Sequence, residues 1–460
     1  MEVYPFRGIR YNQGIIGDLS VVICPPYDII APEQQNFYYG KSDYNAIRLE
    51  YPLTDSRLLS ADSYNSKYSQ AAITFQQWLK QGVLQIDDYP AFYLHEHYFT
   101  YLGEERRRRG LIARVKLEPW GTGIYPHEET VSKAKVDRLQ LMRACQANFS
   151  PLFALYQDSE QKIASVLSEA SQVKPIIDIS VPSPLIGEGE GGERHTIWAI
   201  TNSKSQQQIK RSLAAQALYI ADGHHRYETA LVYQQERYSL HSESSSFVIA
   251  SAAKQSLSGK EALNYVMMEL VDFSDPGLVI LPIHRLVRGI APSTLAKLES
   301  QLKNFFTLDY VPLATESLLT SRHCEQSEAI SKMIGGAVLG IIGMEPQSLL
   351  ILKRRQGVST ETLMPYNRSQ AYKEFGISLL NHIILDKVLS EAKDLDIVYT
   401  VDVNEAYQQI KEGKYQLAFL LNPLQPEIIK AVADAKDRLP RKSTYFYPKL
   451  PTGLVINPLD

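Results

Sequence analysis

The sequence predicts an α/β protein of mixed α+β type, with helices packed on mixed sheets and no transmembrane segment. Short apolar runs typical of strands alternate with longer segments of helical period along most of the 460 residues, which favours sheets covered by helices. The composition, 44% hydrophobic and 22% charged, is that of a globular chain. The longest apolar stretch, residues 335–344, is far shorter than the ~20 residues of a membrane-spanning helix.

The individual elements follow from two periodicities. Alternating or continuously apolar runs predict strands at residues 91–99, 109–117, 150–156, 217–221, 267–271, 279–285, 338–343, 349–353, 396–401 and 416–421. Apolar residues at helical spacing predict helices at residues 64–81, 132–145, 203–216, 224–237, 296–306 and 404–412. Residues 24–30 are predicted as a strand that ends at a rigid proline turn. The basic run 106–109, beside two glutamates, predicts a solvated hairpin or loop.

The chain is predicted to be one unit of residues 1–460 with three parts. These are an N-terminal α/β part (1–160), a central part that carries the main candidate site (161–310) and a C-terminal α/β part (311–460). Three segments differ from the rest in composition and are predicted to be insert-like loops, at residues 181–194, 247–258 and 321–332. The last two segments match the translations of one DNA repeat in two different reading frames. We interpret them as insertions and assign His323 and Cys324 no role in the mechanism.

Cysteine content and charge limit the compartment and the partners. Three cysteines in 460 residues, without a metal-binding spacing, argue against a disulfide framework. The N-terminus lacks a basic segment followed by an apolar one, so we expect no signal peptide and a cytoplasmic protein. The net charge of −3 argues against a nucleic acid or a membrane as partner. The expected partner is a small molecule that carries a phosphate.

The strongest candidate site is the run Asp222-Gly223-His224-His225-Arg226, between a short apolar strand and a helix. Glycine at the turn lets a ligand approach the main chain, and the first turn of a helix presents unpaired N–H groups to an anion. The two histidines and the arginine add donors, and an arginine can grip two phosphate oxygens at once. The alternative is that Asp222 caps the helix and the histidines pack against tyrosines.

A second cluster, residues 123–138, begins at a Gly/Pro turn and leads into a predicted helix. His127, Glu128 and Glu129 are candidates for a general base, and Glu128, together with Asp222, for a Mg²⁺ ligand. Basic residues further along would neutralise phosphate charge; they are Lys133, Lys135 and Arg138. The alternative is a helix N-terminus with acidic residues that suit its dipole.

A third cluster, residues 437–449, is polar, aromatic and basic, which suggests a segment docked along a cleft rather than a frayed end. Its anion-binding candidates are Lys442, Ser443, Thr444 and Lys449. The alternative is an edge strand and a tail. Walker, dinucleotide-binding and nucleophile-elbow motifs are absent from the sequence, which argues against a P-loop kinase, a Rossmann dehydrogenase or an α/β-hydrolase.

Several ordered motifs, spread over nearly the whole chain, carry a family resemblance. They are Pro5-Phe6-Arg7-Gly8, Pro25-Pro26-Tyr27-Asp28, Tyr125-Pro126-His127-Glu128, Ala221-Asp222-Gly223-His224-His225-Arg226 and Lys442-Ser443-Thr444-Tyr445-Phe446-Tyr447-Pro448-Lys449. Together they resemble the uncharacterised bacterial and archaeal family called domain of unknown function 1015, which has no agreed activity. The chain departs from the family pattern mainly at the three insert-like loops.

The Asp-Gly-His-His-Arg turn also resembles, over about ten residues, the phosphate-contacting turn of the partition-protein B/sulfiredoxin superfamily, which includes free-serine kinases. The resemblance implies that Gly223, His224, His225 and Arg226 contact nucleotide phosphates. It places Asp222 beside the metal or the acceptor hydroxyl.

The leading hypothesis is a nucleotide-dependent phosphotransferase acting on a small hydroxylated metabolite, with Mg²⁺ and ATP or ADP at the 222–226 turn. Such chemistry mainly requires positioning and charge neutralisation. Two alternatives remain open. One is a phosphate-ester hydrolase at the same site, and the other is a non-catalytic regulatory protein that binds a nucleotide or a phosphometabolite.

Overall fold

The computed structural model describes residues 1–53, 62–101, 103–130, 132–182, 192–244, 259–313, 334, 338–359, 363–392 and 394–459. The predicted insert-like loops 247–258 and 321–332, including His323 and Cys324, lie outside the described residues, as do residues 183–191 of the loop predicted at 181–194. Among the described residues, no helix combines the length and the apolar character needed to cross a bilayer.

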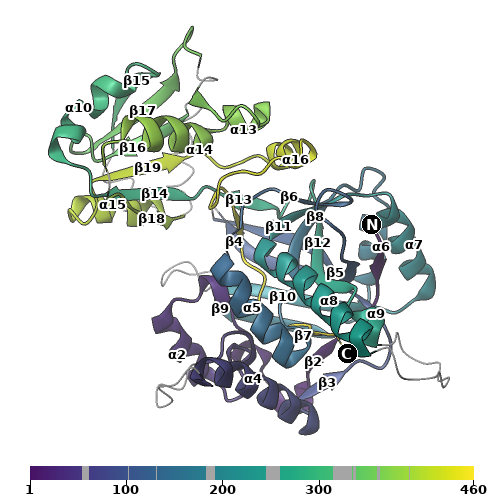
Figure 1. The fold of residues 1–460 in the computed structure, drawn as a ribbon. Helices are drawn as coiled ribbons and strands as arrows, with labels where there is room; N and C mark the ends of the chain where they lie inside the picture. Colours follow the sequence, from purple (N-terminus) through teal and green to yellow (C-terminus); the bar gives the residue numbers. More distant parts are fainter. Residues whose placement is uncertain are drawn as a thin grey trace.

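A nine-stranded mixed sheet forms the larger lobe, at the bottom of Figure 1. Its strands lie in the order β6 (Ile124–Pro126), β11 (Leu218–Asp222), β8 (Leu152–Tyr156), β12 (Tyr265–Asp272), β5 (Glu104–Lys116), β4 (Phe92–Tyr101), β10 (Gly192–Ile200) and β9 (Ile177–Pro182), with β1 (Val3–Tyr4) also paired to β5. Strand β11 runs parallel to β6 and antiparallel to β8, so the predicted mixed sheet is confirmed.

Helices cover both faces of this sheet. Helix α5 (Ser132–Cys145) packs between α4 (Asp62–Lys80) and α8 (His224–Ser244), and α6 (Lys162–Ala170) packs against α7 (Ser203–Ala214) (Figure 1). Alternate residues of β4 and β5 enter different cores. Leu94 and Leu111 pack with α6 and α7, whereas Tyr93 and Ile112 pack with α4. The predicted fold class, helices packed on mixed sheets, is therefore confirmed.

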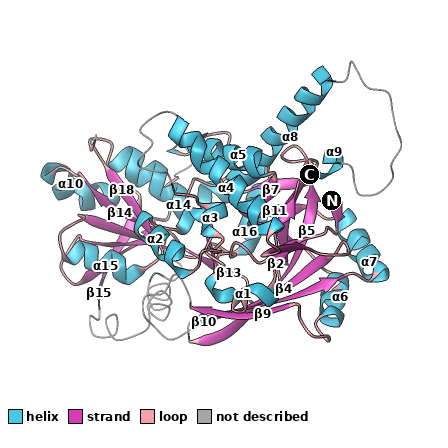
Figure 2. Ribbon diagram, turned by 90° about the horizontal axis from the view of Figure 1, so that it is seen from below, coloured by secondary structure: helices cyan, strands magenta, loops and turns pink. Residues whose placement is uncertain are grey.

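A second, six-stranded sheet forms a lobe of its own, and Figure 2 shows the two groups of strands at opposite ends of the molecule. Its order is β15 (Phe306–Pro312), β17 (Ser348–Arg354), β16 (Leu339–Ile342), β19 (Leu417–Leu421), β14 (His284–Arg288) and β18 (Asp396–Thr400), with every pair antiparallel. Helices of this lobe include α10 (Pro292–Leu302), α13 (Gln370–Glu374), α14 (Gly376–Leu379), a π-helix at Leu380–Val388 and α15 (Val403–Lys411). The division of the chain into parts 1–160, 161–310 and 311–460 stays a prediction.

The end of the chain returns from the second lobe to the first, as the yellow trace in Figure 1 shows. After α16 (Pro426–Asp434), strand β20 (Tyr445–Tyr447) pairs with β13 (Val279–Leu281). Strand β21 (Asn457–Pro458) then pairs with β7 (Ala147–Asn148) in the larger lobe. We call residues 437–459 the C-terminal segment.

Three local predictions were wrong, the third only in part. The strand predicted at 279–285 is two strands in different sheets, because Pro282 cannot donate to a ladder. The strand predicted at 24–30 is a single bridge at Cys24 followed by a short 3₁₀ turn, because Pro25 and Pro26 lack N–H groups. The basic run 106–109 lies in the hairpin formed by β4 and β5, so the predicted hairpin is confirmed, but Arg108 within it is fully buried rather than solvated.

Candidate functional site

The 222–226 turn has the predicted strand–turn–helix form. Strand β11 ends at Asp222, and α8 begins at His224. Between them, Gly223 adopts φ +91°, where a side chain is strained, and a Cβ there would lie 3.1 Å from the Arg226 guanidinium. Glycine therefore allows the chain to reverse tightly, with the N–H groups of the first turn of α8 at the end of the sheet.

Asp222 is the anionic centre of the turn and lies between two cations. Its carboxylate oxygens are 3.5 Å from the Arg226 guanidinium and 3.3 Å from Lys449 Nζ, which comes from the C-terminal segment. Burial would raise the pKa of Asp222, but the charges of Lys449 and Arg226 outweigh it and lower the pKa to about 2. Two cations share one carboxylate, so this centre carries a surplus positive charge.

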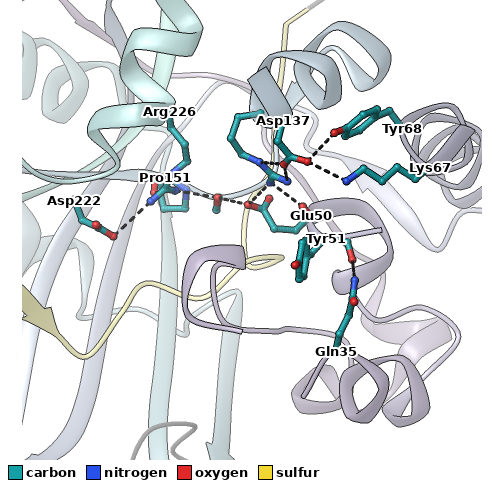
Figure 3. Close-up of polar contacts among 11 residues, drawn as sticks. Gln35, Glu50, Tyr51, Lys67, Tyr68, Asp137, Pro151, Asp222 and Arg226 are labelled. Carbon is teal, nitrogen blue, oxygen red and sulfur yellow. Dashed lines mark hydrogen bonds and ion pairs between the residues drawn. The ribbon is translucent and has the colours of Figure 1, made fainter. Parts of the chain in front are cut away.

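Arg226 also connects the turn to a buried chain of polar groups, drawn in Figure 3. Its Nη1 donates to Pro151 O at 2.7 Å and to Ser150 Oγ at 3.0 Å. Ser150 donates to Glu50 Oε1 at 3.2 Å, and Arg138 lies 3.3 Å from the same oxygen. The contacts of Nη1 fix the position of the Arg226 guanidinium, and its Nη2 atom faces Asp222.

His127, from the loop after β6, joins the turn to the C-terminal segment. Its Nδ1–H donates to Ile220 O at 2.7 Å, so the neutral ring keeps an acceptor at Nε2 for the Thr444 hydroxyl, 2.9 Å away. The side chain is fully buried, and this burial lowers the pKa of His127 to about 4. A neutral imidazole with a defined tautomer therefore positions Thr444.

The two histidines of the turn have different surroundings. The His127 backbone N–H donates to His224 Nε2 at 3.3 Å, and burial holds the pKa of His224 well below its usual value. His225 is only partly buried, and desolvation lowers its pKa while the charge of Glu228 opposes this. His224 is thus part of the packed support, and His225 is the histidine that a ligand can reach.

The predicted acidic residues 128 and 129 tie the loop to other segments. Glu128 accepts the backbone N–H of Lys442 at 2.7 Å and that of Ser443 at 3.4 Å. Burial is the main reason that the pKa of Glu128 is raised. Glu129 instead pairs with Arg368 of the second lobe at 2.8 Å.

The basic and hydroxyl candidates are divided between the turn and its surroundings. Lys135 pairs with Glu228 of α8 at 2.8 Å, one turn beyond the 222–226 turn. Arg138 is held by Asp137, Glu50 and the face of Tyr27. Contacts through Glu50 and Ser150 connect it to Arg226 of the turn. The side chain of Lys133 lies outside the described residues. Ser443 Oγ donates to Pro440 O, and the side chain of Lys442 is exposed.

Sequence reasoning missed several residues around the turn. Glu228 accepts a hydrogen bond from Thr130 and forms ion pairs with Lys135 and Arg438. Arg368 joins Glu129 to Asp437 across the two lobes. In the sequence, these residues stand out only as charged residues on predicted helices or loops, and most surface residues share that property. Asp28, in contrast, lay in a motif that sequence analysis quoted, and its charge adds to burial in raising the pKa of Tyr445.

The three sequence clusters therefore meet in space. Residues 127–128 contact residues 442–444, and Lys449 contacts Asp222. These segments are far apart in the sequence, yet they meet at the N-terminus of one helix. They are one assembly and not three unrelated helix caps.

With this geometry in place, comparison with known proteins gives a family. A family model described as "Protein of unknown function (DUF1015)" matches residues 3–397, and the chain belongs to this family. The resemblance expected from the ordered motifs is thus confirmed. No curated protein matches the chain.

The chain is also similar, at low identity, to several solved structures. A conserved hypothetical protein from Pyrococcus furiosus is 13% identical, with a TM-score of 0.33 and coverage of 75% of this chain and 95% of its own. A free serine kinase in complex with AMP is 12% identical, with a TM-score of 0.34 and coverage of 73% and 86%. SbnI from Staphylococcus aureus, truncated at its C-terminus, is 10% identical, with a TM-score of 0.33 and coverage of 76% and 87%. These values are too low to infer a shared function.

Proposed function

We propose that the protein is a nucleotide-dependent phosphotransferase that acts on a small hydroxylated metabolite and holds phosphate at the 222–226 turn. The observation that carries the proposal is the convergence of three distant segments on the N-terminus of α8, where Arg226 and Lys449 share the single carboxylate of Asp222. A surplus of positive charge beside the N-terminus of a helix is a setting that favours a bound phosphate.

In this proposal the phosphate oxygens accept from the first N–H groups of α8, from the partly buried His225, and from the cations Arg226 and Lys449. The two cations neutralise the charge that builds up as the phosphoryl group moves. His127 acts as a positioning residue, because its buried neutral ring holds Thr444 and with it the start of the segment that ends in Lys449.

The two carboxylates suit different roles. Asp222, with a pKa of about 2, is ionised at all physiological pH values and is a weak base, which suits a Mg²⁺ ligand. Glu128, whose burial raises its pKa, is the better general base for an acceptor hydroxyl. Glu128 also holds Lys442 and Ser443 by their backbone N–H groups, so it orders the segment as well.

The test is an ADP-release assay on the full chain with ATP, Mg²⁺ and a panel of small alcohols, hydroxy acids and hydroxy amino acids. The proposal expects ADP release that depends on one class of acceptor, and phosphorylated acceptor in the products. Phosphate release without any acceptor would replace the proposal with the hydrolase. Tight nucleotide binding without turnover on any acceptor would replace it with the regulatory protein.

A further inference from the structure

A second group of histidines lies fully buried in the middle of the nine-stranded sheet, away from the 222–226 turn. His95 and His97 alternate along β4, and His195 lies directly opposite His97 on the neighbouring strand β10. The three side chains point to the same face, because residues two apart share a face and paired residues face alike. One ring nitrogen from each lies within 4.8 Å of the other two. We call these residues the buried histidine cluster.

Two buried glutamates and an arginine surround the cluster. Glu269 of β12 accepts from His95 Nδ1 at 2.9 Å, and Glu193 of β10 accepts from His97 Nε2 at 2.8 Å. Arg108 Nη2 donates to His97 Nδ1 at 3.1 Å. Gly110 makes room for the first of these contacts, since a Cβ there would lie 2.3 Å from Glu269 Oε1.

These contacts fix the tautomers of the rings. Because His95 Nδ1–H donates to a carboxylate, His95 Nε2 is an acceptor, and the proton in its 3.1 Å contact with His195 Nδ1 belongs to His195. His195 Nε2 then carries a lone pair. It has no hydrogen-bond partner within the described residues and faces Glu193 Oε2, also an acceptor, at 3.7 Å.

The cluster is therefore incomplete as a set of hydrogen bonds. The buried lone pair of His195 Nε2 faces Glu193 Oε2, an acceptor that already receives the proton of His97 Nε2, so the desolvation cost of this lone pair is unrelieved. Glu269 Oε1 is a second buried polar atom, after His195 Nε2, for which the described residues provide no hydrogen-bond partner. The two carboxylates and one guanidinium leave a surplus negative charge. Each of these features is relieved by a bound cation.

We propose that the buried histidine cluster is a binding site for a divalent first-row transition metal of the zinc class, held by imidazole nitrogens of His95, His97 and His195. Imidazole is a ligand that such metals prefer, whereas Mg²⁺ and Ca²⁺ prefer oxygen. The site is distinct from the Mg²⁺ proposed at Asp222 and does not depend on the phosphotransferase proposal.

The distance and the protons at His95 and His195 fit this assignment. His95 Nε2 and His195 Nδ1 are 3.1 Å apart, close to the roughly 3.3 Å between two nitrogens on a tetrahedral zinc with bonds of about 2.0–2.1 Å. On binding, the His195 proton moves from Nδ1 to Nε2, where it faces Glu193, so no orphaned lone pair remains. His95 keeps its Nδ1–H on Glu269, the carboxylate–histidine–metal arrangement that orients such ligands.

The positive charge of Arg108 opposes a metal, and the surrounding contacts limit this effect. Arg108 Nη2 occupies the single lone pair of the neutral His97 ring, so a metal bound to His97 replaces this contact. Arg108 keeps its bonds to the backbone oxygens of Tyr447 and Pro448 at 3.1 and 2.9 Å, and two carboxylates face the cluster. The same two carbonyls precede Lys449, so the cluster and the 222–226 turn share the C-terminal segment.

The metal would join β4 and β10 through its ligands, and β12 through Glu269. Because the cluster is closed to solvent, we assign the metal a structural role, inserted as the chain folds. The experiment is elemental analysis of the full chain, expressed in zinc-supplemented medium and purified without chelator. Close to one zinc per chain is expected. Treatment with a strong chelator should lower the melting temperature by several degrees, and Zn²⁺ should restore it.

Variants locate the metal. The double substitution His95→Gln and His195→Gln should abolish zinc binding, whereas His382→Gln, a histidine of the second lobe, should retain it. Binding of Co²⁺ to the chelator-treated wild type should give the visible ligand-field absorption of a tetrahedral site and provides a readout that needs no variant. Metal-free wild type whose melting temperature and absorption are unchanged by Zn²⁺ and Co²⁺ would overturn the proposal. Unchanged zinc content in the folded double variant would do the same.

Discussion

The 222–226 turn and the buried histidine cluster use similar residues on one sheet but differ in their balance of charge. At the turn, Arg226 and Lys449 share one carboxylate. In the cluster, Glu193 and Glu269 face the single guanidinium of Arg108. The first has a surplus positive charge that suits an anion, and the second has a surplus negative charge that suits a cation. Histidine by itself indicates neither, because a neutral ring can donate or accept.

Exposure separates the two regions further. His225 is partly accessible to solvent, and the turn lies at the end of β11, where three segments meet. A ligand can therefore enter and leave. The three clustered histidines have no accessible surface, so anything bound there stays with the fold. We therefore assign turnover to the turn and stability to the cluster.

The largest expected effect is on turnover, in Asp222→Asn. Removing the charge that we assign to Mg²⁺ should lower kcat by about 10²–10³-fold, the size seen when one electrostatic contact to a transition state is lost. Steady-state ADP release measures it. The control is Asp178→Asn, which breaks an exposed pair with Arg194 on β9 and β10 and should leave kcat unchanged. Equal kcat in Asp222→Asn and wild type would remove Asp222 from the site.

Acid should destabilise the fold between pH 6.5 and 4. Burial lowers the pKa of His127 to about 4, so in this window the unfolded chain binds a proton that the folded chain does not. Stability is therefore fully present above pH 6.5 and falls with pH by up to about 3 kcal/mol for this residue, at 1.36 kcal/mol per pKa unit. Urea unfolding at pH 7, 6 and 5 should show the loss, with a shallower slope in His127→Gln. Identical slopes would contradict the buried neutral ring.

A smaller effect is expected for Gly223→Ala, at φ +91°. The strain should cost about 1–2 kcal/mol of unfolding free energy, and the new Cβ should displace Arg226, so that nucleotide affinity falls as well. Gly413→Ala is the matched control, because Gly413 also has a positive φ, +69°, but no neighbour within 4 Å. It should lose similar stability and keep nucleotide affinity. Equal nucleotide affinities in both variants would show that the turn does not take part in nucleotide binding.

The smallest effect is expected for Arg143→Ala. Arg143 of α5 pairs with Glu236 of α8 on the surface, and exposed pairs contribute about 0.2–1 kcal/mol. Thermal unfolding should shift by no more than this amount, and less at high salt. A larger loss would mean that the α5–α8 contact, and not the turn, limits stability near the site.

The local form of the site was predictable from the sequence, and its assembly was not. The strand, the glycine turn and the helix at 218–224 follow from short-range preferences, and the helix at Ser132–Cys145 has the predicted bounds. The contacts of His127 with Thr444 and of Lys449 with Asp222 span more than 200 residues, and no local signal encodes them. Tertiary folding alone brings such segments together.

The buried histidine cluster shows the same limit. The spacing of His95 and His97 in an alternating strand puts both on one face, which the sequence indicates. That His195 lies opposite His97 depends on the register of β4 and β10, and one residue of slip would turn it to the other face. Arg108 was misjudged for a related reason. A run of four arginines is usually solvated, but alternation along a buried strand turns one of them into the core.

The central claim is that the N-terminus of α8 binds a nucleotide phosphate, and calorimetric titration of the full chain with Mg²⁺-ADP and Mg²⁺-ATP tests it most directly. Wild type should bind, and Arg226→Ala should weaken binding by about 10–100-fold, as expected for a lost charged hydrogen bond. Arg143→Ala, which removes an arginine that pairs with the same helix away from the turn, should bind as wild type does. Absence of binding by wild type, or equal affinities in the two arginine variants, would contradict the account.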